Sequence, residues 1–319
     1  MRIVSLLPAA TEMICVLGLR DELVARSHEC DYPASVVTLP PVVRPSIALE
    51  NLTLREIDLA VAERLRTNGS LYEIDEELLR SLEPDLIVTQ DLCQVCAPSG
   101  NDLVHAIQNL RKQPRVIFLT PHSLQDIDEN LLDIARATGT EERAKQIIES
   151  GSARREAVAA RTRSARRPRV FCMEWLDPIY CSGHWIPEMI DLSGGVDALA
   201  RRGSDSVRIE WDDVMRWAPE VLIAMPCGYG TDRAKAQVSR LFANRGWSDL
   251  PAVRNNRVYA VDANAYFARP GPRVTDGIEV LAHLIHGDAD AWTVPHDAFA
   301  AIDVRRTRQA HSRRSDMRC

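Results

Sequence analysis

Four side chains in this sequence have the types and spacing of a metal site. His28 and Cys30 are separated by one residue, and Cys93 and Cys96 form a Cys-x-x-Cys pair. One imidazole and three thiols suit tetrahedral zinc, and thiolates also bind copper or an iron–sulfur cluster. A redox dithiol and simple packing of buried thiols are alternatives for the same residues. The set therefore makes a bound metal or cluster one hypothesis for the function.

Aromatic side chains make up only 5% of the chain, yet several follow predicted strands directly. Loops at strand ends are normally polar, so this placement predicts an apolar platform for a large, flat ligand. Packing of some of these rings between two lobes is the alternative. The candidate ligand-binding residues in these loops are Pro8, Ala9, Thr11, Tyr32, Glu174, Trp175, His184, Trp185, Cys227, Tyr229, Tyr266, Phe267 and Arg269.

Glu174, Asp177 and His184 are close enough in sequence to share one loop, as an acid–base catalyst requires. Surface or helix-capping roles are the simpler interpretation of these side chains. The sequence contains no nucleophile elbow, phosphate-binding P-loop or dinucleotide-binding glycine motif. A binding protein is therefore favoured over an enzyme.

Short β-branched runs alternate with segments of helical periodicity along most of the chain. This alternation predicts an α/β fold with mostly parallel sheets, in which ligands bind beyond the carboxyl ends of the strands. Helices are predicted over residues 102–111, 124–138 and 274–286. The predicted strands are residues 2–7, 22–27, 85–90, 115–119, 169–174, 221–225 and 257–261.

The chain repeats itself loosely, which predicts two similar lobes. Residues 81–90 resemble residues 216–225, because in both a helix ends before a proline and a strand follows one residue later. Residues 141–166 contain few helix breakers and predict one long charged helix between the lobes, or else a surface helix of the first lobe. We expect two Rossmann-like lobes, joined by this helix, with a ligand cleft between them. The expected divisions are 1–122 and 168–290 for the lobes, 123–167 for the link, and 291–319 for a mobile arginine-rich tail.

Composition limits the classes of partner. The 319 residues carry a net charge of -6, which lacks the basic excess typical of nucleic-acid binding. No apolar run approaches the roughly 18 residues that span a bilayer, so membrane insertion is not expected. Glu12 interrupts the apolar start of the chain, unlike the core of a signal peptide. The sequence therefore predicts a cytoplasmic protein with reduced cysteines.

Three segments carry a family resemblance that covers about residues 1–287. They are residues 2–12 (RIVSLLPAATE), residues 83–87 (EPDLI), and the pair 190–195 and 218–223 (IDLSGG and APEVLI). With these segments the chain resembles the substrate-binding proteins of ABC transporters for cobalamin and iron-siderophores, in which one long helix joins two lobes. Residues 28–33, 90–96 and 183–189 are similar to segments of a subgroup usually called cobalamin-binding proteins.

The resemblance implies a non-catalytic protein that holds a corrinoid of the cobalamin type between its lobes. Trp175, Trp185, Tyr229 and Phe267 would flank the macrocycle, and arginines at 269 and 273 would meet its amide or phosphate groups. A protein that holds zinc or an iron–sulfur cluster on His28, Cys30, Cys93 and Cys96 is the alternative. An ABC permease is a doubtful partner in this interpretation, because no export signal or lipid-anchor cysteine is visible near the start of the sequence.

Overall fold

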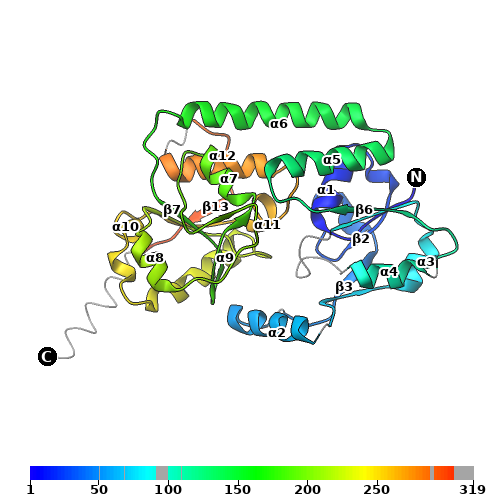
Figure 1. Ribbon diagram of the computed structural model, residues 1–319, viewed down its shortest axis with the longest axis horizontal. Helices are drawn as coiled ribbons and strands as arrows, with labels where there is room; N and C mark the ends of the chain where they lie inside the picture. Colours follow the sequence, from blue (N-terminus) through cyan, green and yellow to red (C-terminus); the bar gives the residue numbers. More distant parts are fainter. Residues whose placement is uncertain (50, 68, 91–99, 109, 288–290, 305–319) are drawn as a thin grey trace. The chain divides into compact units, whose positions relative to one another are not determined.

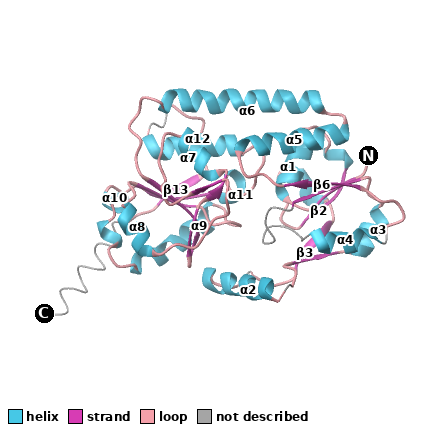
Figure 2. Ribbon diagram, viewed as in Figure 1, coloured by secondary structure: helices cyan, strands magenta, loops and turns pink. Residues whose placement is uncertain are grey.

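The chain folds into two compact α/β units, each built around its own sheet (Figures 1 and 2). A computed structural model describes residues 1–49, 51–67, 69–90, 100–108, 110–287 and 291–304, with side chains at 100–102 left out. Unit 1 comprises Met1–Ser150 and Pro270–Pro272, and unit 2 comprises Gly151–Arg269 and Arg273–Cys319. The predicted α/β fold class is confirmed.

The sheet of unit 1 is parallel except at one edge, as the alternation of strands and helices predicts. Its order is β4-β3-β2-β1-β5-β6, and only β4 runs antiparallel to its neighbour, β3. The strands are β1 Ile3–Ser5, β2 Leu23–Ser27, β3 Pro41–Pro45, β4 Tyr72–Ile74, β5 Leu86–Gln90 and β6 Arg115–Leu119. The helices are α1 Pro8–Val16, α2 Leu54–Arg66, α3 Glu76–Leu82, α4 Gly100–Gln108 and α5 Leu124–Thr138, with 3₁₀ turns at Arg20–Glu22 and Ala34–Thr38.

The central strands of unit 1 are buried on both faces, which explains their continuous apolar sequences. Every residue of β1 and β5 is buried, as expected where helices cover both sides of a parallel sheet. Val4 and Ile87 pack with Leu79 of α3 and Leu103 of α4 in one core cluster. Each such side chain contributes on the order of 2 kcal/mol by leaving water.

The sheet of unit 2 has a parallel centre and antiparallel edges. Its order is β13-β12-β11-β7-β8, in which β8 and β13 are the antiparallel edge strands. The strands are β7 Val170–Leu176, β8 Ile179–Cys181, β11 Val221–Ala224, β12 Val258–Val261 and β13 Phe299–Ala301, with a separate pair β9 Gly183–His184 and β10 Arg201–Arg202. The helices are α7 Ile186–Leu192, α8 Trp211–Trp217, α9 Thr231–Val238, α10 Pro251–Arg254, α11 Ala263–Tyr266 and α12 Val274–His286, with 3₁₀ turns at Ser239–Ala243 and Trp247–Asp249.

The two units repeat the same local turn before a central strand. Glu83 directly follows α3, and Ala218 directly follows α8, each in a left-handed conformation with φ of 43° and 50°. A proline follows in both cases, and the strand begins shortly afterwards. Proline disfavours helical conformation in the residue before it, so the same short signal ends both helices.

One long helix, α6 (Glu141–Thr162), contains the boundary between the units, which falls between Ser150 and Gly151. In unit 2, Arg154 of α6 forms ion pairs with Asp276 (2.7 Å) and Glu279 (2.9 Å) of α12. These bonds fix the second half of α6 against α12. Gly151 has room for a Cβ atom, which would lie 3.5 Å from Thr275 Oγ1.

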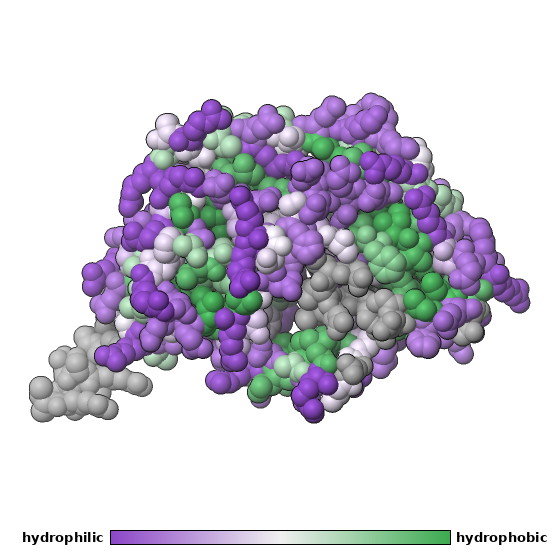
Figure 3. Space-filling model, in the orientation of Figure 1, coloured by the Kyte–Doolittle hydropathy of each residue, from purple (hydrophilic) through white to green (hydrophobic). Residues whose placement is uncertain are grey.

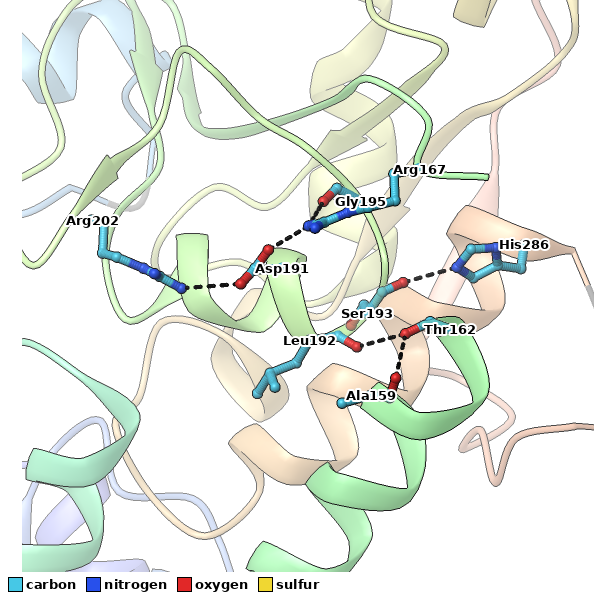
Figure 4. Close-up of polar contacts among 9 residues, drawn as sticks. All are labelled: Ala159, Thr162, Arg167, Asp191, Leu192, Ser193, Gly195, Arg202 and His286. Atoms are coloured by element: carbon cyan, nitrogen blue, oxygen red, sulfur yellow. Dashed lines mark hydrogen bonds and ion pairs between the residues drawn. The ribbon is translucent and has the colours of Figure 1, made fainter. Parts of the chain in front are cut away.

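The end of α6 meets α7 and α12 through bonds to a glycine turn (Figure 4). Thr162 donates a hydrogen bond to Leu192 O (3.1 Å), and His286 Nε2 lies 3.0 Å from Ser193 O. Gly194 has φ of +74°, and a Cβ there would lie 2.7 Å from Thr162 Cβ. Glycine is therefore required at this turn by both its conformation and the space available.

Part of the segment expected to be a mobile tail belongs to the sheet of unit 2. Strand β13 pairs antiparallel with β12, with Tyr259 opposite Ala301 and Val261 opposite Phe299. The arginines from 305 onward lie outside the described residues.

Among the described residues, no helix is long and apolar enough to cross a membrane. Apolar side chains do reach the surface at α2, where Leu59 is 60% exposed (Figure 3).

Candidate functional site

In unit 1, buried neutral groups connect the ends of the first two strands. The Thr11 hydroxyl oxygen, on α1, lies 2.8 Å from Ser5 Oγ and 3.0 Å from Cys30 Sγ. Ser5 in turn donates a hydrogen bond to Leu7 O at 2.9 Å. Cys30 is buried, as are Ser5 and Thr11. The structure thus brings the predicted residues Thr11 and Cys30 together. The Thr11 hydroxyl donates a hydrogen bond to the Cys30 sulfur.

The residues proposed for a metal site are only partly described. The Nδ1 atom of His28 lies 3.2 Å from Val43 O, and its ring lies 6.0 Å from that of Tyr72. Cys93 and Cys96 lie outside the described residues. Among the residues that the structure does describe, no group of three His, Cys, Asp or Glu side chains could hold a metal ion. Within this described part of the chain, zinc or an iron–sulfur cluster therefore has no support.

Other predicted residues of unit 1 lie around the start of α1. Pro8 and Ala9 form its buried first turn. The segment Pro270–Pro272 packs there, because a Cβ on Gly271 would lie 3.6 Å from Glu12 Oε2 and 3.9 Å from Ala9 Cα. Tyr32, which precedes a cis proline, is 46% exposed.

In unit 2, one ring pair and one backbone hydrogen bond connect the carboxyl ends of three neighbouring strands, β7, β11 and β12. The Trp175 and Tyr229 rings meet edge to face with centroids 5.9 Å apart. The guanidinium carbon of Arg233 lies 4.2 Å from the centroid of the Tyr229 ring. The backbone of Tyr229 accepts a hydrogen bond from Ala263 N at 3.1 Å, which ties the loop after β11 to the loop after β12. We call Trp175, Tyr229 and Arg233 the aromatic wall.

Two further candidate aromatics are packing residues inside unit 2. Trp185 donates from Nε1 to Phe267 O at 2.9 Å, and the side chains of both residues are buried. Tyr266 is half-buried, and the guanidinium carbon of Arg273 lies 5.8 Å from its ring centroid. The predicted apolar platform therefore includes rings that support the site from within the unit.

Glu174 holds the strand-end loops of unit 2 together. Its Oε1 accepts a hydrogen bond from Gly183 N at 2.9 Å, and its backbone carbonyl accepts one from Cys227 N at 3.2 Å. Burial raises the pKa of Glu174 to about 7, although the bonds from Gly183 and from the Ser206 side chain lower it. The Cys227 residue itself is exposed.

His184 and Glu174 have different partners. The His184 Nε2 atom lies 3.0 Å from Asp205 Oδ1, and the residue has φ of 50°. Its neighbour Gly183 is very close to the segment that contains Asp205, because a Cβ there would lie 2.5 Å from Ser206 N. Asp177 lies between β7 and β8, before a cis proline. The loop predicted after residue 174 is thus a β-hairpin followed by the β9–β10 pair.

Sequence reasoning missed two carboxyl groups of unit 2. Asp197 accepts hydrogen bonds from Cys172 N (3.2 Å) and Leu199 N (3.0 Å), and burial raises its pKa to about 7. Asp262 accepts from Ala265 N (2.8 Å) at the start of α11, and burial raises its pKa against the opposing effect of nearby arginines. A signal for Asp262 was its position directly after a predicted strand and before a helix. Asp197 lies two residues after the Gly194-Gly195 pair, and a pair of glycines indicates only a turn.

Comparison with known proteins identifies the family. The family model described as "Periplasmic binding protein" matches residues 3–265. A vitamin B12-binding protein of Vibrio parahaemolyticus is 24% identical over 89% of each chain, and an uncharacterized ABC transporter substrate-binding lipoprotein of Bacillus subtilis is 25% identical over 90% of this chain and 80% of its own. The solved periplasmic vitamin B12 binding protein of Vibrio cholerae has a TM-score of 0.64 at 24% identity, covering 89% of this chain and 96% of its own. A periplasmic heme binding protein from Pseudomonas aeruginosa has a TM-score of 0.69 at 19% identity, covering 95% and 98%.

These relatives correct two predictions. The prediction of a cytoplasmic protein is wrong, because the relatives are a lipoprotein and periplasmic proteins, which points to an extracytoplasmic location. The doubt about a permease partner is not supported either, because a relative is a component of an ABC transporter. Both predictions came from the beginning of the sequence rather than from its fold. The binding of a small-molecule ligand remains supported.

Proposed function

Because the chain belongs to the periplasmic binding protein family, we propose that it captures a corrinoid of the cobalamin type for an ABC importer. The observation that carries the proposal is its similarity to vitamin B12-binding proteins over 87–89% of its length. The polar and aromatic residues described above support a ligand of this kind. The membrane permease of the importer would be its protein partner.

The aromatic wall gives unit 2 a surface suited to a large, partly apolar ring system. Trp175 is half-buried, and the Tyr229 ring packs edge to face against its indole. Arg233 is exposed above the Tyr229 ring. Rigid aromatic surfaces bind flat ligands at low entropic cost, because their rings lose few rotamers.

A direct test is the absorption spectrum of the purified chain after incubation with cyanocobalamin and gel filtration. We expect the corrinoid bands to elute with the protein, and titration calorimetry to give a micromolar or tighter Kd. Haemin and a ferric siderophore, added in parallel, identify the ligand class. Retention of haemin without retention of cobalamin would overturn the proposal. A brown iron–thiolate spectrum that disappears in a Cys93→Ser, Cys96→Ser double variant would instead support a cluster.

Removing the Trp175 ring from the aromatic wall should weaken corrinoid binding strongly. For Trp175→Ala we expect a loss of about 2 kcal/mol in binding free energy, or roughly thirtyfold in Kd, which is typical of a well-placed aromatic. Trp211→Phe is the matched control, because Trp211 stacks on Trp247 elsewhere in unit 2. Calorimetry of both variants measures the difference. Equal affinities for Trp175→Ala and the unmodified chain would show that the wall does not contact the ligand.

A further inference from the structure

We propose that β6 is an interaction surface for a second copy of this chain, and that two copies join by antiparallel pairing of their β6 strands. The proposal does not depend on the ligand, because it concerns only one edge of the sheet in unit 1. Strand β6 is the last strand of that sheet (Figure 1), and among the described strands it pairs with β5 alone. Its other edge therefore offers backbone hydrogen-bonding groups to a further strand.

The backbone groups of Val116 and Phe118 face this open edge. Arg115 N–H donates a hydrogen bond to Asp85 O at 2.9 Å, so Arg115 directs its peptide groups toward β5. Successive residues of a strand direct these groups to opposite sides, so Ile117 faces β5 as well. Val116 and Phe118 alternate with these residues. Their N–H and C=O groups therefore point away from β5.

The side chains along the open edge are mainly apolar. Phe118 is 42% exposed, although it lies within a strand. Val116, on the same face two residues earlier, packs against the core cluster of unit 1. Edge strands are commonly protected from pairing by charges or prolines along their length. Strand β6 has a charge only at its first residue, Arg115, so the remainder of the edge lacks this protection.

Strand β6 is complementary to itself in antiparallel register. A two-fold axis at Ile117 places Val116 of one copy opposite Phe118 of the other, where the two residues exchange two backbone hydrogen bonds. This pair also combines an aromatic with a β-branched side chain, which stabilises neighbouring strands. Arg115 falls opposite Leu119, so no like charges meet within the paired segment.

The charges on either side of β6 favour a second copy over an unrelated extended peptide. Arg111 and Arg115, before and at the start of the strand, are exposed. Helix α5 follows the end of the strand, and its first half contains Asp126 and Glu129. Antiparallel pairing brings the start of each strand to the end of the other. Basic residues of one copy then approach acidic residues of the other, which is electrostatically favourable.

The test measures self-association of the full chain by sedimentation equilibrium between about 5 and 500 μM. Five residues from each copy form a small interface, so we expect a weak dimer with a Kd on the order of 50 μM. Phe118→Lys places a charge on the pairing edge and should raise this Kd at least about tenfold. Leu59→Lys is the matched control, because Leu59 is 60% exposed on α2, and it should leave the Kd unchanged. Circular dichroism of both variants shows that they are folded.

Hydrogen exchange of single amides, followed by NMR, identifies the strand that pairs. Between about 20 and 500 μM chain, exchange at Val116 and Phe118 should slow about threefold, as the fraction of dimer rises. Exchange at Ile117 should change little, because its amide already faces β5. In Phe118→Lys the dependence of Val116 on concentration should disappear.

Three results would overturn the proposal. A monomer at every concentration would leave the edge to an extended segment of another protein. A dimer with the same Kd in Phe118→Lys would pair through a different surface. Slow exchange at Phe118 that is independent of concentration would show that the edge is covered within one chain. None of these results affects the proposed binding of a corrinoid, which is measured separately.

Discussion

The polar groups that join the strand ends differ between the two units. In unit 1 they are the hydroxyls of Ser5 and Thr11 and the thiol of Cys30, all neutral. In unit 2 the carboxyl group of Glu174 accepts a hydrogen bond from the backbone N–H of Gly183 in β9, and that of Asp197 accepts one from Cys172 in β7. Neutral and ionisable groups can therefore perform the same joining role in two similar units.

Because of this difference, we expect the protonation of unit 2 to change with pH near neutrality. The pKa of Glu174 and that of Asp197 are both raised to about 7. In the described part of unit 1, Cys15 has its pKa raised to about 11, and Asp85, paired with Lys112, has its pKa lowered. Proton uptake by native unit 2 is therefore expected between pH 4.5 and 7. All six tryptophans belong to unit 2, so their fluorescence follows that unit alone.

The largest expected effect tests how tightly the loops of unit 2 are packed. In Gly183→Ala the new Cβ would lie 2.5 Å from Ser206 N and 2.6 Å from Ser204 O, which are backbone atoms that cannot rotate away. We expect a loss of roughly 4 kcal/mol in stability, at the upper end for a single substitution. Urea unfolding followed by tryptophan fluorescence measures it. Gly203→Ala is the control, because its Cβ meets open space and only its φ of +65° costs about 1 kcal/mol.

The second prediction concerns the pH dependence itself. The folded pKa of Glu174 lies above its value of 4.5 in an unfolded chain, so its stabilisation is fully present below pH 4.5 and is lost as pH rises through 7. The shift corresponds to a difference on the order of 3 kcal/mol. We expect Glu174→Gln, which keeps an acceptor oxygen but cannot ionise, to flatten the fall in stability between pH 5 and 8.

Fluorescence-detected unfolding at several pH values compares the two chains, with Glu188→Gln as a control on α7. At pH 8 the Glu174→Gln protein should be the more stable of the two. An unchanged slope would mean that Glu174 does not keep its proton in the native state, and the contrast between the units would disappear.

The smallest expected effect is in unit 1. In Thr11→Val the buried hydroxyl between Ser5 and Cys30 is removed, which should cost about 1 kcal/mol. Hydrogen exchange of the peptide that contains β1 should become about fivefold faster. Unchanged stability and unchanged exchange in Thr11→Val would contradict a structural role for this hydroxyl.

Much of the framework was predictable because its signals are local. The predicted ranges 115–119, 124–138 and 274–286 coincide with β6, α5 and α12. The long charged helix ends at Thr162, close to the predicted end. These segments combine clear periodicity with end signals such as the Ser123 cap and Gly139, which act within a few residues.

Elements that depend on distant partners were missed. Strand β3 begins and ends with proline, so its sequence does not predict a strand. It nevertheless pairs with β2 and β4. Strands β8 and β13 have three residues each and exist because β7 and β12 offer free edges. Three residues do not establish a period that a sequence pattern can detect.

Local signals in the sequence were enough to predict the α/β class, the repeated helix–proline–strand turn and the positions of the loops that follow the central strands. Periodicity and proline act over a few residues, so these features are visible without a structure. The folded structure was needed to show which loop residues are buried, as Trp185 and Phe267 are, and which carboxyl groups have a pKa near neutral pH. Burial and electrostatic environment arise from side chains far apart in sequence, such as Trp185 and Phe267 or Cys172 and Asp197, which only folding brings together.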